Sequence, residues 1–265
     1  TGIFRHMDFD TRIAGFADFV GRKKYLYDDN GHGTHVAGII AASGKGSNGK
    51  YRGIAPDTFL VSVKVLDKSG NGKIENVVEA AGWIIENKSA MNIRVVNISF
   101  GTRAKMENGP AIETGEDDYA LIMAVEKMWD SGIVVVAAAG NNGPGNTSVT
   151  APGISKKIIT VGAFDDKNFF SGRGPTRECI VKPEVVVTGS NIIACNNHQG
   201  RYSSKSGTSM AAPVVSGAVA RLIKNNPDIT PKEVKIWMKS CCKKINVPSE
   251  KQGWGVLDIR KFVTG

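Results

Sequence analysis

Short runs of β-branched and other apolar residues alternate with segments of helical apolar spacing through most of this chain, and this alternation restricts the fold more than any other feature. Such runs are typical of parallel strands that are buried on both faces. The pattern predicts an α/β fold, a three-layer sandwich with a mostly parallel central sheet flanked by helices. The predicted strands are 59–66, 93–98, 133–138 and 158–161, and the predicted helices are 74–85, 119–129, 209–223 and 231–240.

The starts of two late helices can be read from single residues. Pro213 lies in the first turn of the helix predicted from Ser209, where a missing N–H costs nothing. Thr230 stands before Pro231 in the position of an N-cap. The polar stretch 102–118 is predicted to be a long surface loop.

The length of 265 residues suits one large domain, so residues 1–265 are predicted to form a single catalytic domain. The formal net charge of +9 would attract polyanions. The lysines are scattered, however, and the densest set, in 232–244, has the spacing of a solvated helix face. No nucleic-acid partner is therefore expected. No apolar run approaches the roughly 20 residues of a membrane span, so no membrane partner is expected either.

The cysteines follow neither a metal-binding spacing nor a dense disulfide framework. Free thiols are typical of a reducing compartment, so a cytoplasmic location is predicted, with secretion as the alternative. The four residues are Cys179, Cys195, Cys241 and Cys242.

The segment 28–35, with the sequence DDNGHGTH, holds His32 between two glycines at the start of an apolar helix. Such a histidine faces a cleft, although a single histidine is more often structural than catalytic. His32 and His35 also form an H-x-x-H pair, which raises the alternative of zinc. The glutamate of the H-E-x-x-H motif is absent, so a metal centre is not predicted.

Two further loops carry chemistry. Asn141 follows the strand 133–138 in a glycine-rich turn that could cradle phosphate, reverse the chain, or present the Asn141 amide to a developing oxyanion. Ser209 lies on the first turn of a helix among small residues that leave its hydroxyl accessible. This serine could cap the helix, help to bind an anion, or act as a nucleophile.

Together the three loops supply a base, an oxyanion donor and a nucleophile, which is the set that acyl transfer needs. The segments GHGTHVAG at 31–38, AAAGN at 137–141 and GTSMAAP at 207–213 resemble those of the subtilisin-like serine proteases, and they occur in the same order. The resemblance extends over nearly the whole chain. The segments 15–18 and 27–30 resemble most the bacterial intracellular members of this family.

The resemblance implies a serine endopeptidase that acts through an acyl-enzyme. Ser209 would be the nucleophile and His32 the general base, and Asn141 with the Ser209 backbone N–H would stabilise the oxyanion. The resemblance also implies that the polypeptide substrate binds as an extended strand between two backbone segments. These segments are Gly70, Asn71 and Gly72 on one side and Ser99, Phe100 and Gly101 on the other.

The resemblance places the first specificity pocket beside the end of the strand 133–138. Its walls would be Ala138, Ala139 and Gly140, with Thr150 near its floor. No acidic residue is placed there, so a broad or apolar preference is expected.

One catalytic group of the family is absent from this sequence. The family's triad aspartate precedes a Ser/Thr-Gly pair, and the chain opens on Thr1-Gly2, so the aspartate is expected just before Thr1, together with the first strand of the fold. Neither Asp8 nor Asp10 is assigned to the triad. We expect upstream residues that are cleaved or omitted. A catalytically silent relative that binds or regulates peptides is the alternative.

The resemblance requires no cofactor. It allows a structural calcium ion near Asp8, in the family-like segment His6-Met-Asp-Phe9, and the loop 44–50, and it allows an upstream propeptide. The loop 44–50 also fits G-x-x-x-x-G-K, but Tyr51 stands where a phosphate-binding loop needs Ser or Thr. An esterase or lipase is a further alternative, which the absence of a G-x-S-x-G motif disfavours.

Overall fold

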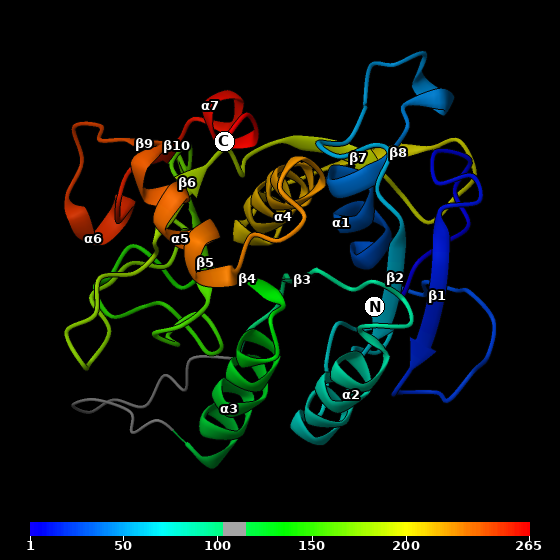
Figure 1. Cartoon of the computed structure of the whole chain (residues 1–265), viewed down its shortest axis with the longest axis horizontal. Helices are drawn as coiled ribbons and strands as arrows, with labels where there is room; N and C mark the ends of the chain where they lie inside the picture. The colour runs from blue at the N-terminus through cyan, green and yellow to red at the C-terminus, as the bar shows by residue number, and fades with distance from the viewer. Residues whose placement is uncertain (103–114) are drawn as a thin grey trace.

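The computed structural model describes residues 1–102 and 115–265 (Figure 1). The helices are α1 (His32–Ala41), α2 (Ile74–Asn87), α3 (Glu116–Asp130), α4 (Thr208–Asn225), α5 (Pro231–Ser240), α6 (Ser249–Gln252) and α7 (Ile259–Val263), with a 3₁₀ turn η1 (Lys45–Ser47). The strands are β1 (Ile13–Asp18), β2 (Leu60–Lys64), β3 (Val95–Ile98), β4 (Val134–Ala138), β5 (Ile159–Ala163), β6 (Val185–Val187), β7 (Ile192–Cys195), β8 (Tyr202–Lys205), β9 (Cys242–Lys243) and β10 (Val256–Leu257).

The largest sheet has six strands in the order β3-β4-β5-β6-β10-β9. All neighbours in it pair in parallel except β9, which is antiparallel to β10. A separate parallel pair is formed by β1 and β2, and β7 with β8 forms an antiparallel hairpin. The predicted mostly parallel α/β sandwich is therefore confirmed.

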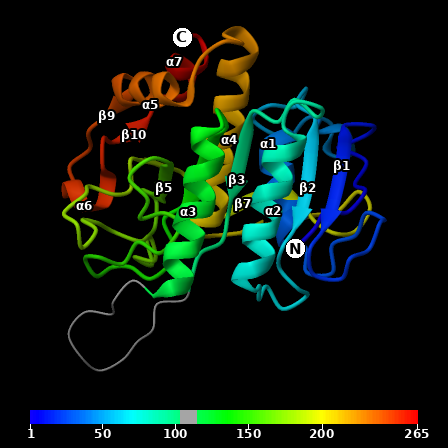
Figure 2. The ribbon, with the colours of Figure 1, turned by 60° about the horizontal axis from the view of Figure 1, so that its bottom comes forward.

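Alternate residues of β4 explain the three layers. Val134 and Val136 pack into a core with α4, whereas Val135 and Ala137 pack into a second core with α2 and α3. A strand that is buried on both faces has no polar side, which is why β4 reads as a continuous apolar run. Helices α1 and α4 lie on one side of the strands and α2 and α3 on the other (Figures 1 and 2).

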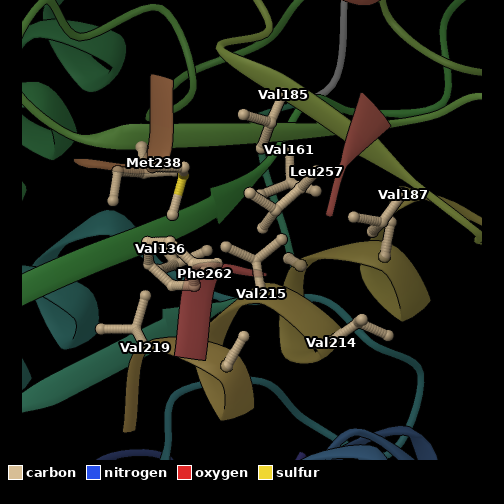
Figure 3. Close-up of a cluster of buried hydrophobic side chains, with 14 of the residues drawn as sticks. Val136, Val161, Val185, Val187, Val214, Val215, Val219, Met238, Leu257 and Phe262 are labelled. Carbon is tan, nitrogen blue, oxygen red and sulfur yellow. The ribbon is translucent and has the colours of Figure 1, made fainter. Parts of the chain in front are cut away.

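Helix α4 is the central element of the larger core. Its valines Val214, Val215 and Val219 meet side chains from β4, β5 and β6 and from the C-terminal helices (Figure 3). Small residues allow other segments to approach closely, since a Cβ on Gly217 would lie 2.7 Å from Ile54 Cβ. The first turn of α4, which carries Ser209, is therefore held by one of the most buried helices of the fold.

Most predicted elements are present, with shifted ends. Helix α3 starts at Glu116, three residues earlier than predicted, because Glu116, Asp117 and Asp118 suit the positive end of the helix dipole. The prediction of a loop over 102–118 is wrong for these three residues. Its central part, 103–114, lies outside the described residues. The N-cap prediction at Thr230 is confirmed by a complete capping box with Glu233.

A gap in strand pairing separates β2 from β3. The two strands belong to different sheets, and a cavity of about 1240 Å³ is lined by residues of both. The strand predicted at 59–66 is thus present as β2, but it pairs with β1 and not with the large sheet.

Candidate active site

His32 is the first residue of α1, and a fixed loop positions it. Gly31 precedes it with φ of 93°, a conformation that favours glycine. The buried Asp28 carboxylate holds this turn in place. Its Oδ1 accepts from the Gly31 N–H at 2.8 Å. Its Oδ2 accepts from the Thr34 N–H at 2.8 Å and from the Thr34 hydroxyl at 2.6 Å. Asp28 therefore fixes the start of α1, and with it the backbone of His32.

Ser209 is the second residue of α4, and its side chain is partly exposed. Its Oγ donates to the Ser99 carbonyl at 2.9 Å, and the Ser99 Oγ donates to the Ser209 carbonyl at 2.9 Å. This reciprocal pair ties the start of α4 to the residue that follows β3. It also places Ser99 against the predicted nucleophile.

Asn141 follows Gly140, which has φ of 91°. The Asn141 Oδ1 accepts from both the N–H and the hydroxyl of Thr208, each at 3.0 Å. The other end of the amide, Nδ2, lies next to Gly207, where an added Cβ would be 3.0 Å away. Asn141 thus presents an N–H donor beside the start of the helix that carries Ser209, as an oxyanion donor must.

Thr208 connects the two loops, and no role was predicted for it. It is fully buried, and besides bonding Asn141 its Oγ1 accepts from the Gly140 N–H at 3.1 Å. The signal was present in the sequence: Thr208 is the hydroxyl-bearing residue directly before the predicted nucleophile, in a segment of small residues. Its three hydrogen bonds appear only when the chain is folded.

The His32 ring has a different environment. Within 1–102 and 115–265 no hydrogen bond to it is present, and its pKa is lowered to about 4. Burial is the main cause, followed by the positive charges of the Thr1 amino group and Lys205, which outweigh the opposite effect of Asp28. A base with this pKa is a poor acceptor for a serine proton at neutral pH, because general-base catalysis works best near the operating pH.

The predicted substrate-binding segments occupy two separate positions. Gly70, Asn71 and Gly72 are exposed in the loop between β2 and α2, where the Asp67 carboxylate accepts from the N–H of Asn71 at 2.9 Å. The segment Ser99, Phe100 and Gly101 follows β3, and Phe100 packs into the cores beside α2 and α3. Whether a substrate strand pairs with both segments stays a prediction.

Thr150 lies between the predicted pocket wall at Gly140 and the predicted substrate-binding segment at Gly101. A Cβ on Gly101 would be 2.5 Å from its Oγ1, and a Cβ on Gly140 would be 2.7 Å from it. Ala138 and Ala139, at the end of β4, are buried. The three predicted segments around residues 101, 140 and 150 therefore come together, and Thr150 fills space between the backbone walls.

A family model described as the subtilase family matches residues 1–255. The chain belongs to the subtilase family. Serine protease AprX of Bacillus subtilis (strain 168) is 41% identical over 267 residues, which cover 91% of this chain and 59% of that protein. Subtilisin DY of Bacillus licheniformis is 35% identical over 228 residues, covering 85% of this chain and 75% of that protein. This subtilase chain thus spans about three fifths of AprX.

Solved structures give the same result for the fold. The subtilase chain superposes on Sphericase with a TM-score of 0.82 at 26% identity, covering 97% of this chain and 88% of that one. A cold adapted subtilisin-like serine proteinase gives a TM-score of 0.77 at 30% identity, covering 97% of this chain and 84% of that one. The predicted family resemblance is therefore confirmed.

The calcium site that the resemblance allowed does not match this subtilase well. The buried Asp8 carboxylate accepts from the Gly46 N–H at 2.7 Å, the Tyr202 hydroxyl at 2.9 Å and the Cys195 thiol at 3.7 Å. Calcium needs six to eight oxygen ligands. Three protein donors instead satisfy the carboxylate, and His6, which lies beside it, bonds the Arg201 carbonyl at 3.1 Å.

Two other expectations concern a metal and a membrane. The first is the H-x-x-H pair: the His35 Nε2 lies 3.1 Å from the Ile192 carbonyl and 2.9 Å from the Ser203 carbonyl. This contact fixes α1 to the β7-β8 hairpin. Among the described helices of the subtilase, none has the length and apolar character needed to cross a bilayer.

Proposed function

We propose that this subtilase chain carries the catalytic machinery of a serine endopeptidase that cleaves extended polypeptides through an acyl-enzyme. The observation that carries the proposal is the Thr208 connection, which places the Asn141 amide beside the start of the helix bearing Ser209. A serine that only capped the helix would not need an oriented amide at this place. The family membership supports the same assignment.

Each residue then has a defined step. The Ser209 Oγ leaves the Ser99 carbonyl and attacks the scissile carbonyl carbon, while His32 takes the hydroxyl proton. The Asn141 Nδ2 and the Ser209 N–H donate to the oxyanion. His32 returns the proton to the leaving amine, and water then hydrolyses the acyl-enzyme by the same route.

To act as general base, the His32 imidazole needs a hydrogen-bond partner. In the family mechanism a carboxylate orients the imidazole and stabilises the imidazolium that forms. Asp28 cannot do this, since its Oδ1 accepts from the turn before α1 and its Oδ2 accepts from Thr34 in the first turn of α1. The predicted position of the acid, just before Thr1, therefore stays part of the proposal.

The substrate pocket is proposed to favour apolar or small side chains. Thr150 occupies space between Gly101 and Gly140, and no acidic side chain is among the residues that converge there. The extended substrate would bond the backbone of residues 70–72 and 99–101, so that affinity comes from main-chain contacts and selectivity from this pocket.

A fluorophosphonate probe tests the nucleophile. It reacts with serines that have both a base and an oxyanion hole, so labelling is expected at Ser209, located by peptide mass mapping. Ser209→Ala should remove the label, and Ser204→Ala, which changes an exposed serine of β8, should retain it. Equal labelling of Ser209→Ala and the unaltered chain would overturn the assignment.

A silent peptide-binding subtilase is the second candidate, and the lowered pKa of His32 is the observation that favours it. Turnover separates the two functions. A silent relative would bind an extended peptide and leave it intact, with an affinity that Ser209→Ala does not change.

We also propose that the chain works in the cytoplasm. The four thiols are free, and burial raises the pKa of the Cys242 thiol to about 12, which suits a stable reduced form. Mass spectrometry of host cells alkylated before lysis would test this, since a disulfide in the native protein contradicts the proposal.

A further inference from the structure

A histidine, an aspartate and a cysteine meet in the interior of the protein beside the β7-β8 hairpin. Their ligand atoms, on His6, Asp8 and Cys195, all lie within 4.8 Å of one another. All three residues are buried, with exposed fractions of 1%, 0% and 0%. None of them takes part in the proposed hydrolysis. Two of them precede β1 and the third ends β7, so the cluster forms only when the chain folds.

The separation between sulfur and oxygen in this cluster fits a tetrahedral zinc ion. The Cys195 Sγ lies 3.7 Å from the Asp8 Oδ2. Zinc binds thiolate sulfur at about 2.3 Å and carboxylate oxygen at about 2.0 Å. At a tetrahedral angle these bond lengths place the sulfur and the oxygen about 3.5 Å apart. Little movement of either side chain is therefore needed to admit the ion.

The other polar atoms of His6 and Asp8 are already held by hydrogen bonds. The His6 Nδ1 accepts from the Asp8 N–H at 3.1 Å, and the His6 Nε2 lies 3.1 Å from the Arg201 carbonyl. A backbone N–H only donates and a carbonyl only accepts, so the ring is neutral and carries its proton on Nε2. Histidines that bind a metal commonly donate their other ring N–H to a carbonyl in this way. The Asp8 Oδ1 accepts from the Gly46 N–H at 2.7 Å, which leaves Oδ2 for the thiol side of the cluster.

Charge and ligand chemistry favour zinc over calcium at this position. A thiolate and a carboxylate together carry two negative charges, and with a neutral imidazole they balance a divalent cation, so no net charge is buried. Sulfur and imidazole are ligands that suit zinc, whereas calcium takes six to eight oxygens. Among the described residues of this cluster, Asp8 is the one carboxylate. The set is therefore a zinc set and a poor calcium set.

The cluster connects three segments that are far apart in the sequence. His6 and Asp8 belong to the segment before β1, Gly46 to the η1 turn, and Cys195 to the β7-β8 hairpin (Figure 1). The hairpin also lies against α1, because a Cβ on Gly38 would be 2.9 Å from the Cys195 nitrogen. An ion bound here would therefore fix the hairpin to the segment before β1, beside the helix that begins at residue 32.

We propose that His6, Asp8 and Cys195 form a structural site for one zinc ion. The His6 Nδ1, the Asp8 Oδ2 and the Cys195 Sγ bind the metal, and solvent takes the fourth tetrahedral position. On binding, the thiol releases its proton to solvent and the Asp8 N–H gives up its contact with Nδ1, and no electron is transferred. The Tyr202 hydroxyl, which donates to Oδ2 at 2.9 Å, orients the carboxylate. The site does not depend on the proposed function.

Metal content and the spectrum of a cobalt form test the site in the full chain. The protein is stripped with a chelator, incubated with Zn²⁺ in an excess of Ca²⁺, and passed through a desalting column before elemental analysis. One zinc per chain is expected despite the calcium. Co²⁺ bound in place of zinc should show the sulfur-to-metal charge-transfer band of a thiolate ligand. Both readouts are made on the unaltered chain, so they do not require that a variant folds.

Three variants locate the bound ion. Cys195→Ser removes the sulfur with little change in size, and it should abolish the charge-transfer band and weaken zinc binding by at least ~100-fold, since changes beside a metal ligand already cost about 10–100-fold. Tyr202→Phe should keep the band and weaken binding by about 10-fold. Cys241→Ser is the matched control, because Cys241 is also buried and lies outside the cluster, and it should keep both the band and the affinity.

Thermal unfolding separates metal binding from a folding defect, because each variant is compared with its own metal-free form. Zinc should raise the Tm of the unaltered chain and of Cys241→Ser and leave the Tm of Cys195→Ser unchanged. A stripped chain that takes up no zinc would overturn the site. Equal zinc retention by Cys195→Ser would show adventitious binding elsewhere, against the proposal. Displacement of the zinc by calcium would contradict a sulfur-ligated site.

Discussion

The two halves of the candidate site are built in different ways. Ser209 and Asn141 are joined through Thr208 by hydrogen bonds between neighbouring loops, on a helix whose body fills the core. His32 has a fixed backbone but an imidazole without a hydrogen-bond partner in the described residues. The nucleophile half is thus held together by bonds within this chain, and the base half depends on a carboxylate that meets the imidazole.

The largest effect is expected from His32→Ala in a form of the chain that hydrolyses peptides. Peptide hydrolysis should fall by about 10⁶-fold, since loss of the base in subtilisin has this size. The rate is measured as kcat on a fluorogenic peptide. His198→Ala is the matched control, because His198 is exposed and should leave the rate unchanged. A loss below 10-fold for His32→Ala would show that another group acts as base.

Asn141→Ala tests the completed half and should lower kcat by about 10²–10³-fold with little change in KM, because the amide acts only on the oxyanion. Asn142→Ala, at the exposed neighbouring position, serves as the control. A rise in KM with unchanged kcat would mean that Asn141 binds substrate in its ground state and is not an oxyanion donor.

Thr150→Gly should widen the pocket that the two halves share. The relative kcat/KM for a peptide with a large apolar residue before the scissile bond, against one with alanine there, should increase by about 10-fold. Thr147→Gly, an exposed change in the same loop, should leave this ratio unaltered. An unchanged ratio for Thr150→Gly would remove Thr150 from the pocket floor.

The smallest expected effect is a change in the pH dependence of stability. The folded chain lowers the pKa of His32 to about 4 from a usual 6.5, so the unfolded state binds the proton first as the pH falls. Stability contributed by the neutral ring is full above pH 6.5 and is lost between pH 6.5 and about 4. Urea unfolding at pH 7 and pH 4.5 should therefore show a smaller pH difference for His32→Gln than for the unaltered chain.

Local sequence was sufficient for the completed half. Ser209 and Asn141 each lie in a short glycine-rich segment next to a regular element, and their positions follow from where those elements begin and end; the backbone of His32 is placed in the same way. The contribution of Thr208 could not be predicted, because its partners are 67 and 68 residues away. Similarly, Asp28 was read only as part of the histidine segment, although its carboxylate holds the whole turn.

The sheet was predicted less completely than the site. Strand β1 was missed because Gly15 and Asp18 interrupt its apolar pattern, and β9 and β10 are too short to produce a period. The unpaired edges of β2 and β3 depend on which strands pair, a property that the apolar pattern of either strand does not contain. The expectation of a missing first strand came from family resemblance.

Helix α4 links the position of the Ser209 hydroxyl to the packing of the hydrophobic core. The reacting hydroxyl lies on the second residue of α4, and the other end of this helix packs among the C-terminal helices. Any tilt of α4 would therefore move the hydroxyl away from the Asn141 amide. Heating, or a cavity-forming substitution anywhere along α4, should therefore displace the Ser209 hydroxyl before the protein unfolds. In such a protein, activity falls as soon as the core packing around α4 becomes looser.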